Sequence, residues 1–223
     1  MSGLRLPKAL AATRATELFD GLTSTVVSDA LDQLGVNGAL VDIAPIGVGM
    51  RMIGLAQTVF QEPRPEGVAM TTITATHSLF VDHEVRAGAV VVVSTPLAPV
   101  ASSWGYLLSL RSLRLGAAGT VIDGSVRDPE SIIETGYPVF ASKGRQVSAG
   151  SKLRLRTVGT DVPVICAGVA IEPGDVILGD DSGVVACPRG LVEDAAALAR
   201  EISKAEKELE RRIRGGGYLN ENG

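Results

Sequence analysis

Apolar residues along this chain gather in short β-branched runs, and segments with helical spacing lie between these runs. The run AVVVVS at residues 89–94 is continuous and β-branched, which is typical of a strand buried on both faces. Turn-forming Gly, Pro and Asp residues separate the runs. We expect further strands at residues 52–61, 121–122, 137–140, 152–157, 162–171, 176–178 and 184–187.

Helical segments lie at both ends of the chain and in its middle. We expect helices at residues 6–20, 23–34, 70–83, 107–115, 130–134 and 191–214, with loops at residues 38–49 and 95–103. The last helix is long and amphipathic, and its charged residues recur at a spacing of four. Strands and glycine-rich turns combined with helices in these places predict an α/β fold with a central sheet layer.

Length and charge limit the class of protein. The 223 residues are enough for a single domain, residues 1–223. The net charge of -4 argues against a nucleic-acid partner, and no basic stripe is present in the sequence. No stretch reaches the length of a membrane span, and the amino terminus lacks the pattern of a signal peptide. We therefore expect a cytoplasmic protein that binds neither nucleic acid nor membrane.

The cysteines and histidines are weak candidates for a metal or redox site. Cys166 and Cys187 lie in apolar, strand-like contexts without a CxxC motif, which favours buried free thiols over a metal or redox role. His77 and His83 are six residues apart, so they do not share one face of a helix. We interpret them as surface or core residues.

The candidate chemistry lies in residues 104–128, which read WGYLLSLRSLRLGAAGTVIDGSVRD. A helix-length segment and a short strand are followed by Gly124, whose turn places Arg127 and Asp128 at the end of the strand. An arginine offers a fork of donors to a carboxylate, and an aspartate is a hard oxygen ligand for Mg²⁺ or Mn²⁺. The alternative is that the two residues only pair within a turn. Ser102 and Ser103 precede the stretch and could contribute hydroxyls to a site, although small loop residues are more often only structural.

This stretch resembles the RraA-like family, which includes the divalent-metal-dependent 4-hydroxy-4-methyl-2-oxoglutarate and 4-carboxy-4-hydroxy-2-oxoadipate aldolases. The shared pattern is G-[acid]-LL, a segment of fixed length, and DG-x-VRD. The resemblance covers nearly the whole chain. It includes TSTVVSDALDQLG at residues 23–35, RMIGLAQTV around Gly54, PVF at residues 138–140, and PGDVILGDDSGVVACP at residues 173–188.

The resemblance implies a fold and an assembly. The fold would be of the swivelling β/β/α type, a single domain with a central sheet layer and a long carboxyl-terminal helix. The chain would form homotrimers, or hexamers of paired trimers, with sites between subunits. The helix at about residues 191–214 would pack on a neighbouring subunit, and Glu206 matches a glutamate that approaches the metal from that subunit.

The resemblance also implies roles for individual residues. Arg127 would be a catalytic residue that pairs with the substrate carboxylate, and Asp128 would ligate the metal, either Mg²⁺ or Mn²⁺. The backbone N–H groups of Leu107 and Leu108 would donate to the substrate, as is natural at the amino terminus of a helix. Gly105, which opens this helix, is counted with them as substrate-binding.

Several positions depart from the family pattern. The aldolases carry an acid where this chain has Tyr106, and a phenol is neutral at pH 7. We therefore treat Tyr106 as a catalytic candidate that donates a hydrogen bond or acts as a general acid. Acids usual in the family are also absent at Ala89, Ser94 and Ser131. These departures predict weaker metal binding or a different reaction.

Two hypotheses from different classes follow. The first is a metal-dependent lyase that acts on a small 2-oxo acid, as a class II pyruvate aldolase, an oxaloacetate-type decarboxylase or a specialised variant. The second is a non-enzymatic RraA-like regulator that binds another protein. Retention of Arg127 and Asp128 favours the enzyme, whereas Tyr106 favours the regulator or the specialised variant.

Overall fold

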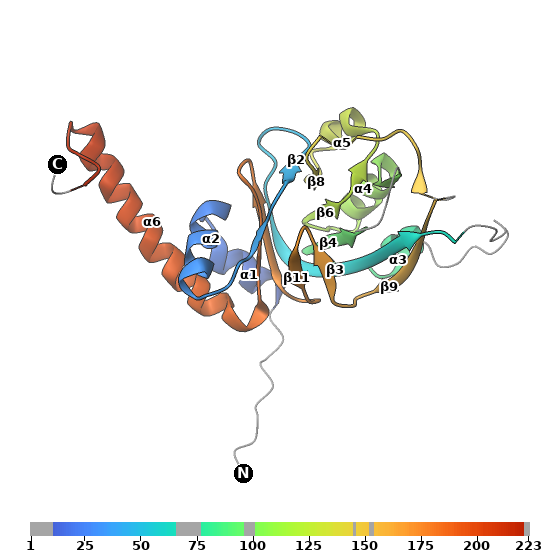
Figure 1. Ribbon diagram of the computed structural model, residues 1–223, viewed down its shortest axis with the longest axis horizontal. Helices are drawn as coiled ribbons and strands as arrows, with labels where there is room; N and C mark the ends of the chain where they lie inside the picture. Colours follow the sequence, from blue (N-terminus) through green and yellow to red (C-terminus); the bar gives the residue numbers. More distant parts are fainter. Residues whose placement is uncertain (1–10, 66–76, 96–100, 145, 152–153, 221–223) are drawn as a thin grey trace, which may run out of the picture.

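The computed structural model describes residues 11–65, 77–95, 101–144, 146–151 and 154–220 (Figure 1). Within these residues the centre of the molecule is a nine-stranded sheet in the order β1-β13-β12-β3-β4-β6-β8-β2, with β9 paired to β3. These strands are β1 (Ala39–Leu40), β2 (Ile43–Pro45), β3 (Met52–Pro63), β4 (Ala89–Ser94), β6 (Gly119–Asp123), β8 (Val139–Ser142), β9 (Leu155–Thr160), β12 (Val176–Asp180) and β13 (Gly183–Cys187).

The strands β3, β4, β6 and β8 are parallel neighbours. All six residues of β4 are buried, which confirms the prediction of a strand covered on both faces. Val90 and Val92 enter one core cluster, and Val91 and Val93 enter another on the opposite face. The carboxyl ends of these parallel strands meet at one edge of the sheet, where α/β proteins commonly bind ligands.

Helices cover the sheet in two groups. Helices α1 (Ala12–Phe19), α2 (Ser24–Gln33) and α6 (Val192–Arg214) share a core cluster with β12 and β13. Helices α3 (His77–His83), α4 (Tyr106–Arg114) and α5 (Pro129–Thr135) lie around β4, β6 and β8 (Figure 1). The expected α/β arrangement with a central sheet and a long carboxyl-terminal helix is therefore confirmed.

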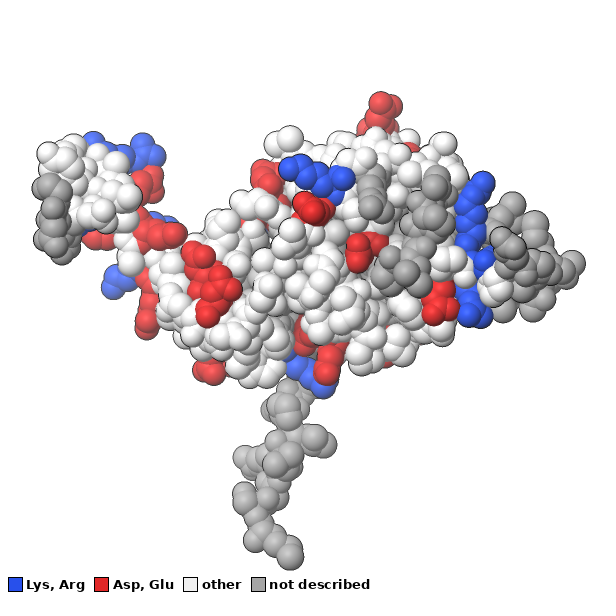
Figure 2. Space-filling model, viewed as in Figure 1, with Lys and Arg blue, Asp and Glu red and all other residues white. Residues whose placement is uncertain are grey.

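The second half of α6 extends away from the body of the molecule beyond α2 (Figure 1). Side chains of both signs follow one another along it (Figure 2), and some form ion pairs within the helix, such as Arg211 with Glu208 and Arg214 with Glu210. Such pairs stabilise a solvated helix only slightly. No helix in the described residues combines the length and the apolar character that crossing a membrane requires.

Several predicted boundaries were wrong. Residues 162–171 form a hairpin instead of one strand, with β10 (Val164–Cys166) and β11 (Val169–Ile171) joined at Ala167 and Gly168. Both joining residues have positive φ, 47° and 83°, which suits a tight hairpin turn. The sequence pattern concealed this turn because apolar residues lie on either side of it.

Two expected loops and one expected strand also differ from the structure in their extent. The expected loop at residues 38–49 contains β1 and β2, which pair with β13 and β8. The expected loop at residues 95–103 ends in a strand, β5 (Ser102–Trp104), and β9 is shifted towards the carboxyl terminus from the expected 152–157. Residues 6–10 and 70–76 of two expected helices, and residues 96–100 of the expected loop, lie outside the described residues.

Both cysteines are buried free thiols, as the sequence predicted. Burial, followed by the charge of Asp175, raises the pKa of the Cys187 thiol to about 12. Burial and the charge of Asp123 raise the pKa of the Cys166 thiol in the same direction. Both groups therefore remain protonated in the folded protein at neutral pH.

We expect the folding stability to fall as the pH rises from about 9 towards 12. The thiols of the unfolded chain ionise near their ordinary pKa of about 8.5, whereas the buried thiols stay protonated, so only the unfolded state gains from proton loss. Urea unfolding at about pH 8, 9.5 and 11 measures this decline. The decline should be shallower for Cys187→Ala, and an identical pH dependence in both proteins would contradict the assignment.

Candidate active site

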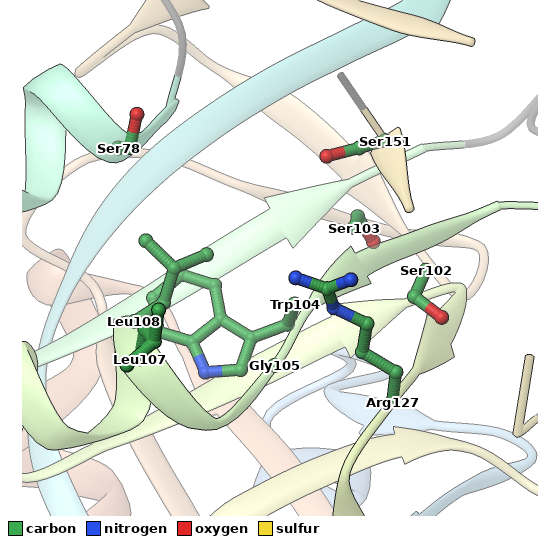
Figure 3. A pocket seen from close by; sticks show the side chains of 9 residues that line it. All are labelled: Ser78, Ser102, Ser103, Trp104, Gly105, Leu107, Leu108, Arg127 and Ser151. Carbon is green, nitrogen blue, oxygen red and sulfur yellow. The ribbon is translucent and has the colours of Figure 1, made fainter. Parts of the chain in front are cut away.

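A pocket of about 230 Å³ lies beyond the carboxyl ends of β4 and β6. It is lined by β5 and by Arg127, the residue after β7 (Ser125–Val126). The strands β5 and β7 pair in parallel and follow β4 and β6 in the chain. A cavity of this size holds several water molecules, which suits a small acid. The lining residues are Ser78, Ser102, Ser103, Trp104, Gly105, Leu107, Leu108, Arg127 and Ser151 (Figure 3).

Strand pairing places Arg127 against Gly105. The backbone N–H of Arg127 donates to the carbonyl of Trp104 at 3.1 Å, so the residue lies beside the start of α4. A Cβ atom added to Gly105 would lie 3.0 Å from Arg127 Cγ and 3.1 Å from its Nε. A Cβ on Gly150 would lie 3.4 Å from Nη1 of the same guanidinium. The arginine side chain therefore passes between two glycine backbones.

Asp128 follows Arg127 in a left-handed backbone conformation, with φ 57° and ψ 43°, at the start of α5. Its carboxylate makes no capping hydrogen bond to that helix. Arg127 Nε and Asp128 Oδ2 are 3.6 Å apart, and both side chains are about half exposed, at 47% and 49%. An ion pair this exposed contributes little to stability. Arg127 and Asp128 therefore pair, as the alternative interpretation of the sequence expected, but the pairing leaves both groups accessible to a ligand.

The amino terminus of α4 forms the wall of the pocket next to Arg127. Gly105 is its N-cap, in extended conformation, and supplies no side chain to cap the helix. The first N–H groups of a helix have no acceptor within the helix, and the helix dipole makes this end positive. Leu107 and Leu108, in the first turn, line the pocket. Arg127 and these N–H groups together make a site suited to an anion.

Residues 24–186 match the RraA-like family, described as Aldolase/RraA. This match spans most of the 223 residues. The chain belongs to the RraA-like family.

Relatives with assigned names are of two kinds. Protein DlpA of Legionella pneumophila is 35% identical over 198 residues, which cover 88% of this chain but only 31% of DlpA, so the chain spans about a third of that protein. A Halalkalibacterium halodurans protein, provisionally named 4-hydroxy-4-methyl-2-oxoglutarate aldolase, is 29% identical over 87% of this chain and 86% of its own length.

Solved structures agree with the RraA-like fold. An uncharacterized protein from Pseudomonas syringae superimposes with a TM-score of 0.84 and 30% identity, covering 98% of this chain and 96% of that protein. Streptomyces coelicolor RraAS2, described as an unusual member of the RNase ES inhibitor RraA protein family, has a TM-score of 0.76 and 25% identity. That match covers 92% of this chain and 100% of RraAS2.

Two predicted site residues of this RraA-like chain lie away from the pocket. Tyr106, the first residue of α4, is half-buried and packs against the core cluster around Trp104, and it is not among the lining residues. Glu206 is exposed on α6, which packs with α1 and α2 at the end of the molecule away from α4 (Figure 1). Within one chain, Glu206 does not contribute to this pocket; its expected role requires a neighbouring copy.

The donor set for a metal is small. In the described part of the chain, no three His, Cys, Asp or Glu side chains gather closely enough to hold a metal ion. Magnesium usually keeps several waters and binds through one or two carboxylates together with oxygens of the substrate. The accessible carboxylate of Asp128 fits such a weakly held ion. Ser94, where the resemblance to the family predicts an acid, is buried in β4, and its hydroxyl donates to the carbonyl of Ile165 at 2.5 Å.

Four serines line the site, and sequence reasoning missed two of them, Ser78 and Ser151. Ser78 and Ser151 reach the pocket from segments distant in the chain, so no local motif signals them. The hydroxyl of Ser102 donates to the carbonyl of Val147, which agrees with the structural role expected for it. Ser103 differs, because its hydroxyl is buried and has no hydrogen-bond partner among the described residues.

Proposed function

We propose that this RraA-like protein is a divalent-metal-dependent lyase that acts on a small 2-oxo acid, as a pyruvate aldolase or an oxaloacetate-type decarboxylase. The observation that carries the proposal is the position of Arg127. Its guanidinium lies between two glycines, beside the uncapped start of α4 and next to the carboxylate of Asp128. A guanidinium fork matches the geometry of a carboxylate, and lyase chemistry on a 2-oxo acid requires that group to be held.

The residues of the pocket have distinct tasks in this proposal. Arg127 binds and orients the substrate carboxylate, while the N–H groups of Leu107 and Leu108 donate to oxygens on which negative charge develops as the carbon–carbon bond breaks. Asp128 would hold Mg²⁺ or Mn²⁺, with Glu206 of a neighbouring copy nearby. When bound, the ion would supply Lewis-acid stabilisation of that negative charge. Tyr106 supplies no carboxylate, which predicts a weaker metal site than in relatives with an acid there.

The direct test is release of pyruvate from oxaloacetate and from 4-hydroxy-4-methyl-2-oxoglutarate. Each substrate is assayed with Mg²⁺, with Mn²⁺ and with a chelator. Release that depends on the ion supports the lyase. Absence of release from both substrates under every condition would contradict a pyruvate-forming reaction.

We expect Tyr106→Asp to bind Mn²⁺ about tenfold more tightly than the unaltered protein, because a shorter, charged side chain in the first turn of α4 can leave the core and add an oxygen ligand at the positive end of the helix. The preceding residue, Gly105, lies beside Asp128, since a Cβ added to it would lie 3.3 Å from the Asp128 Oδ2. Calorimetric titration with Mn²⁺ measures the change. Tyr106→Asn is the matched control, since it removes the ring and adds no charge. If both variants change affinity equally, the loss of the ring and not the added charge is responsible.

A second candidate function is regulation through protein contact. Helix α4 exposes Leu107, Leu110 and Leu113, whose exposed fractions are 71%, 37% and 39%. Apolar side chains gathered on one helix suit a partner surface. RraAS2, with 25% identity, belongs to a family described as RNase ES inhibitors. Inhibition of an RNase of that type by this chain, retained in Arg127→Ala, would favour regulation over catalysis.

Exposed apolar side chains also support assembly of the chain into a homotrimer or hexamer, because they suit an interface between copies. The far half of α6 and the residues after it expose Ile213, Tyr218 and Leu219, at 44%, 69% and 65%. A neighbouring copy that covers these side chains would also bring Glu206 out of bulk solvent. Analytical ultracentrifugation of the unaltered chain tests this, and a monomer at micromolar concentration would contradict it.

A further inference from the structure

We infer that Ser103 is a substrate-binding residue of the pocket, whose hydroxyl donates to a carboxylate oxygen of the acid that Arg127 binds. The inference rests on the proposed function for the chemical class of the ligand. It deepens that function because it assigns a second anchor to the same carboxylate.

Burial is the first observation that supports this role. Ser103 is only 1% exposed, and among the described residues its Oγ has no hydrogen-bond partner. Polar atoms buried in proteins are nearly always satisfied, because a hydroxyl that loses water without gaining a partner destabilises the fold. An orphaned hydroxyl that lines a pocket is therefore explained most simply by a partner that arrives with the ligand.

The direction of the side chain is the second observation. Successive side chains of a strand point to opposite faces, and in β5 the hydroxyl of Ser102 is engaged by Val147 while that of Ser103 is not. Ser103 and Arg127 line the same pocket (Figure 3). Ser103 needs a glycine beside it, because a Cβ added to Gly124 would lie 3.4 Å from the Ser103 Oγ and 2.4 Å from the Thr95 Oγ1.

The surrounding charges select the ligand. The described lining residues contribute one cation, the uncapped N–H groups of α4 and serine hydroxyls, and none of them carries a carboxylate. A hydroxyl that shares a pocket with a guanidinium gains most as a donor to an anion, because charge-assisted hydrogen bonds are about twice as strong as neutral ones. A carboxylate bound by Arg127 keeps lone pairs that can accept a hydrogen bond from the hydroxyl of Ser103.

The test compares Ser103→Ala with Ser112→Ala, which removes a hydroxyl from an equally buried serine of α4 outside the pocket. Oxalate is titrated calorimetrically into chelator-treated protein, and the midpoint of thermal unfolding is measured for each variant. We expect Ser103→Ala to weaken oxalate binding about 10- to 100-fold, with an unfolding midpoint no lower than that of the unaltered protein. Ser112→Ala should keep its affinity within about threefold.

Other results would overturn the inference. These are an unchanged affinity in Ser103→Ala, a parallel loss of affinity and thermal stability in that variant, or no oxalate binding by the unaltered protein. Different results would contradict the proposed function and the role of Ser103. Serine-dependent oxalate binding without any pyruvate release contradicts the lyase alone, whereas full pyruvate release by Ser103→Ala contradicts the role of Ser103 alone.

Discussion

Replacement of Arg127 by alanine is expected to lower kcat/KM for pyruvate release by about 10²- to 10³-fold. The guanidinium is the only cationic side chain among the described lining residues, so no neighbouring charge in the pocket replaces it. Its salt bridge to Asp128 is half exposed, which means that its loss costs the fold little. Steady-state kinetics on oxaloacetate, with thermal unfolding as a check on the fold, measures both effects.

Two further variants make this result specific. Arg127→Lys keeps the charge but loses the planar fork, so we expect its activity to lie between those of the alanine variant and the unaltered protein. Arg189→Ala removes an exposed arginine that pairs with Glu172 far from the pocket, and it should leave the kinetics unchanged. An Arg127→Ala protein that retains activity within about threefold would show that this arginine does not bind the substrate.

Replacement of Gly105 by alanine is expected to lower kcat/KM by about 10²-fold without a loss of stability. The backbone of Gly105 is extended, with φ -168°, so alanine is accommodated there without backbone strain. Its Cβ would however lie 3.0 Å from Arg127 Cγ and 3.3 Å from Asp128 Oδ2, and both side chains must move. Because both side chains are half exposed, they can give by the few tenths of an ångström that these contacts require, which displaces the guanidinium while sparing the fold.

Gly190→Ala is the matched control for this prediction. A Cβ at Gly190 meets no atom within 4 Å, so the substitution changes the unfolded chain in the same way and disturbs no site. Kinetics and unfolding midpoints of the two variants are compared directly. A Gly105→Ala protein as active as Gly190→Ala would indicate that the position of Arg127 does not limit the reaction.

The sequence predicted most of the elements whose signals are local. The β-branched run at β4, the leucine-rich α4 and the charged α6 all appear, because each carries its own period of apolar residues. For the hairpin of β10 and β11 the sequence pattern predicts a single strand, since apolar residues continue on both sides of Ala167. The short strands β1 and β2 exist through pairing with distant partners, which local sequence does not reveal.

The same distinction applies to the candidate site. Gly105, Leu107, Leu108 and Arg127 meet in one pocket because they belong to a single strand–helix–strand unit whose motif is continuous in sequence. Ser78 and Ser151 could not be found in this way, because tertiary packing alone brings them there. Tyr106 packs against the core instead of lining the pocket, an orientation that depends on how α4 is rotated on the sheet. Whether these residues bind a substrate stays a prediction.

The left-handed backbone at Asp128 limits how this protein can change over evolutionary time. With φ at 57°, the position accepts Asp, Asn or Gly at low cost, whereas most other side chains would strain the turn into α5. A lineage that abandons the carboxylate can therefore drift to Asn or Gly in one step and keep its fold. Loss of the reaction would then appear in the sequence as a single exchange at position 128. The rest of the fold would be unchanged and could serve as a binding protein.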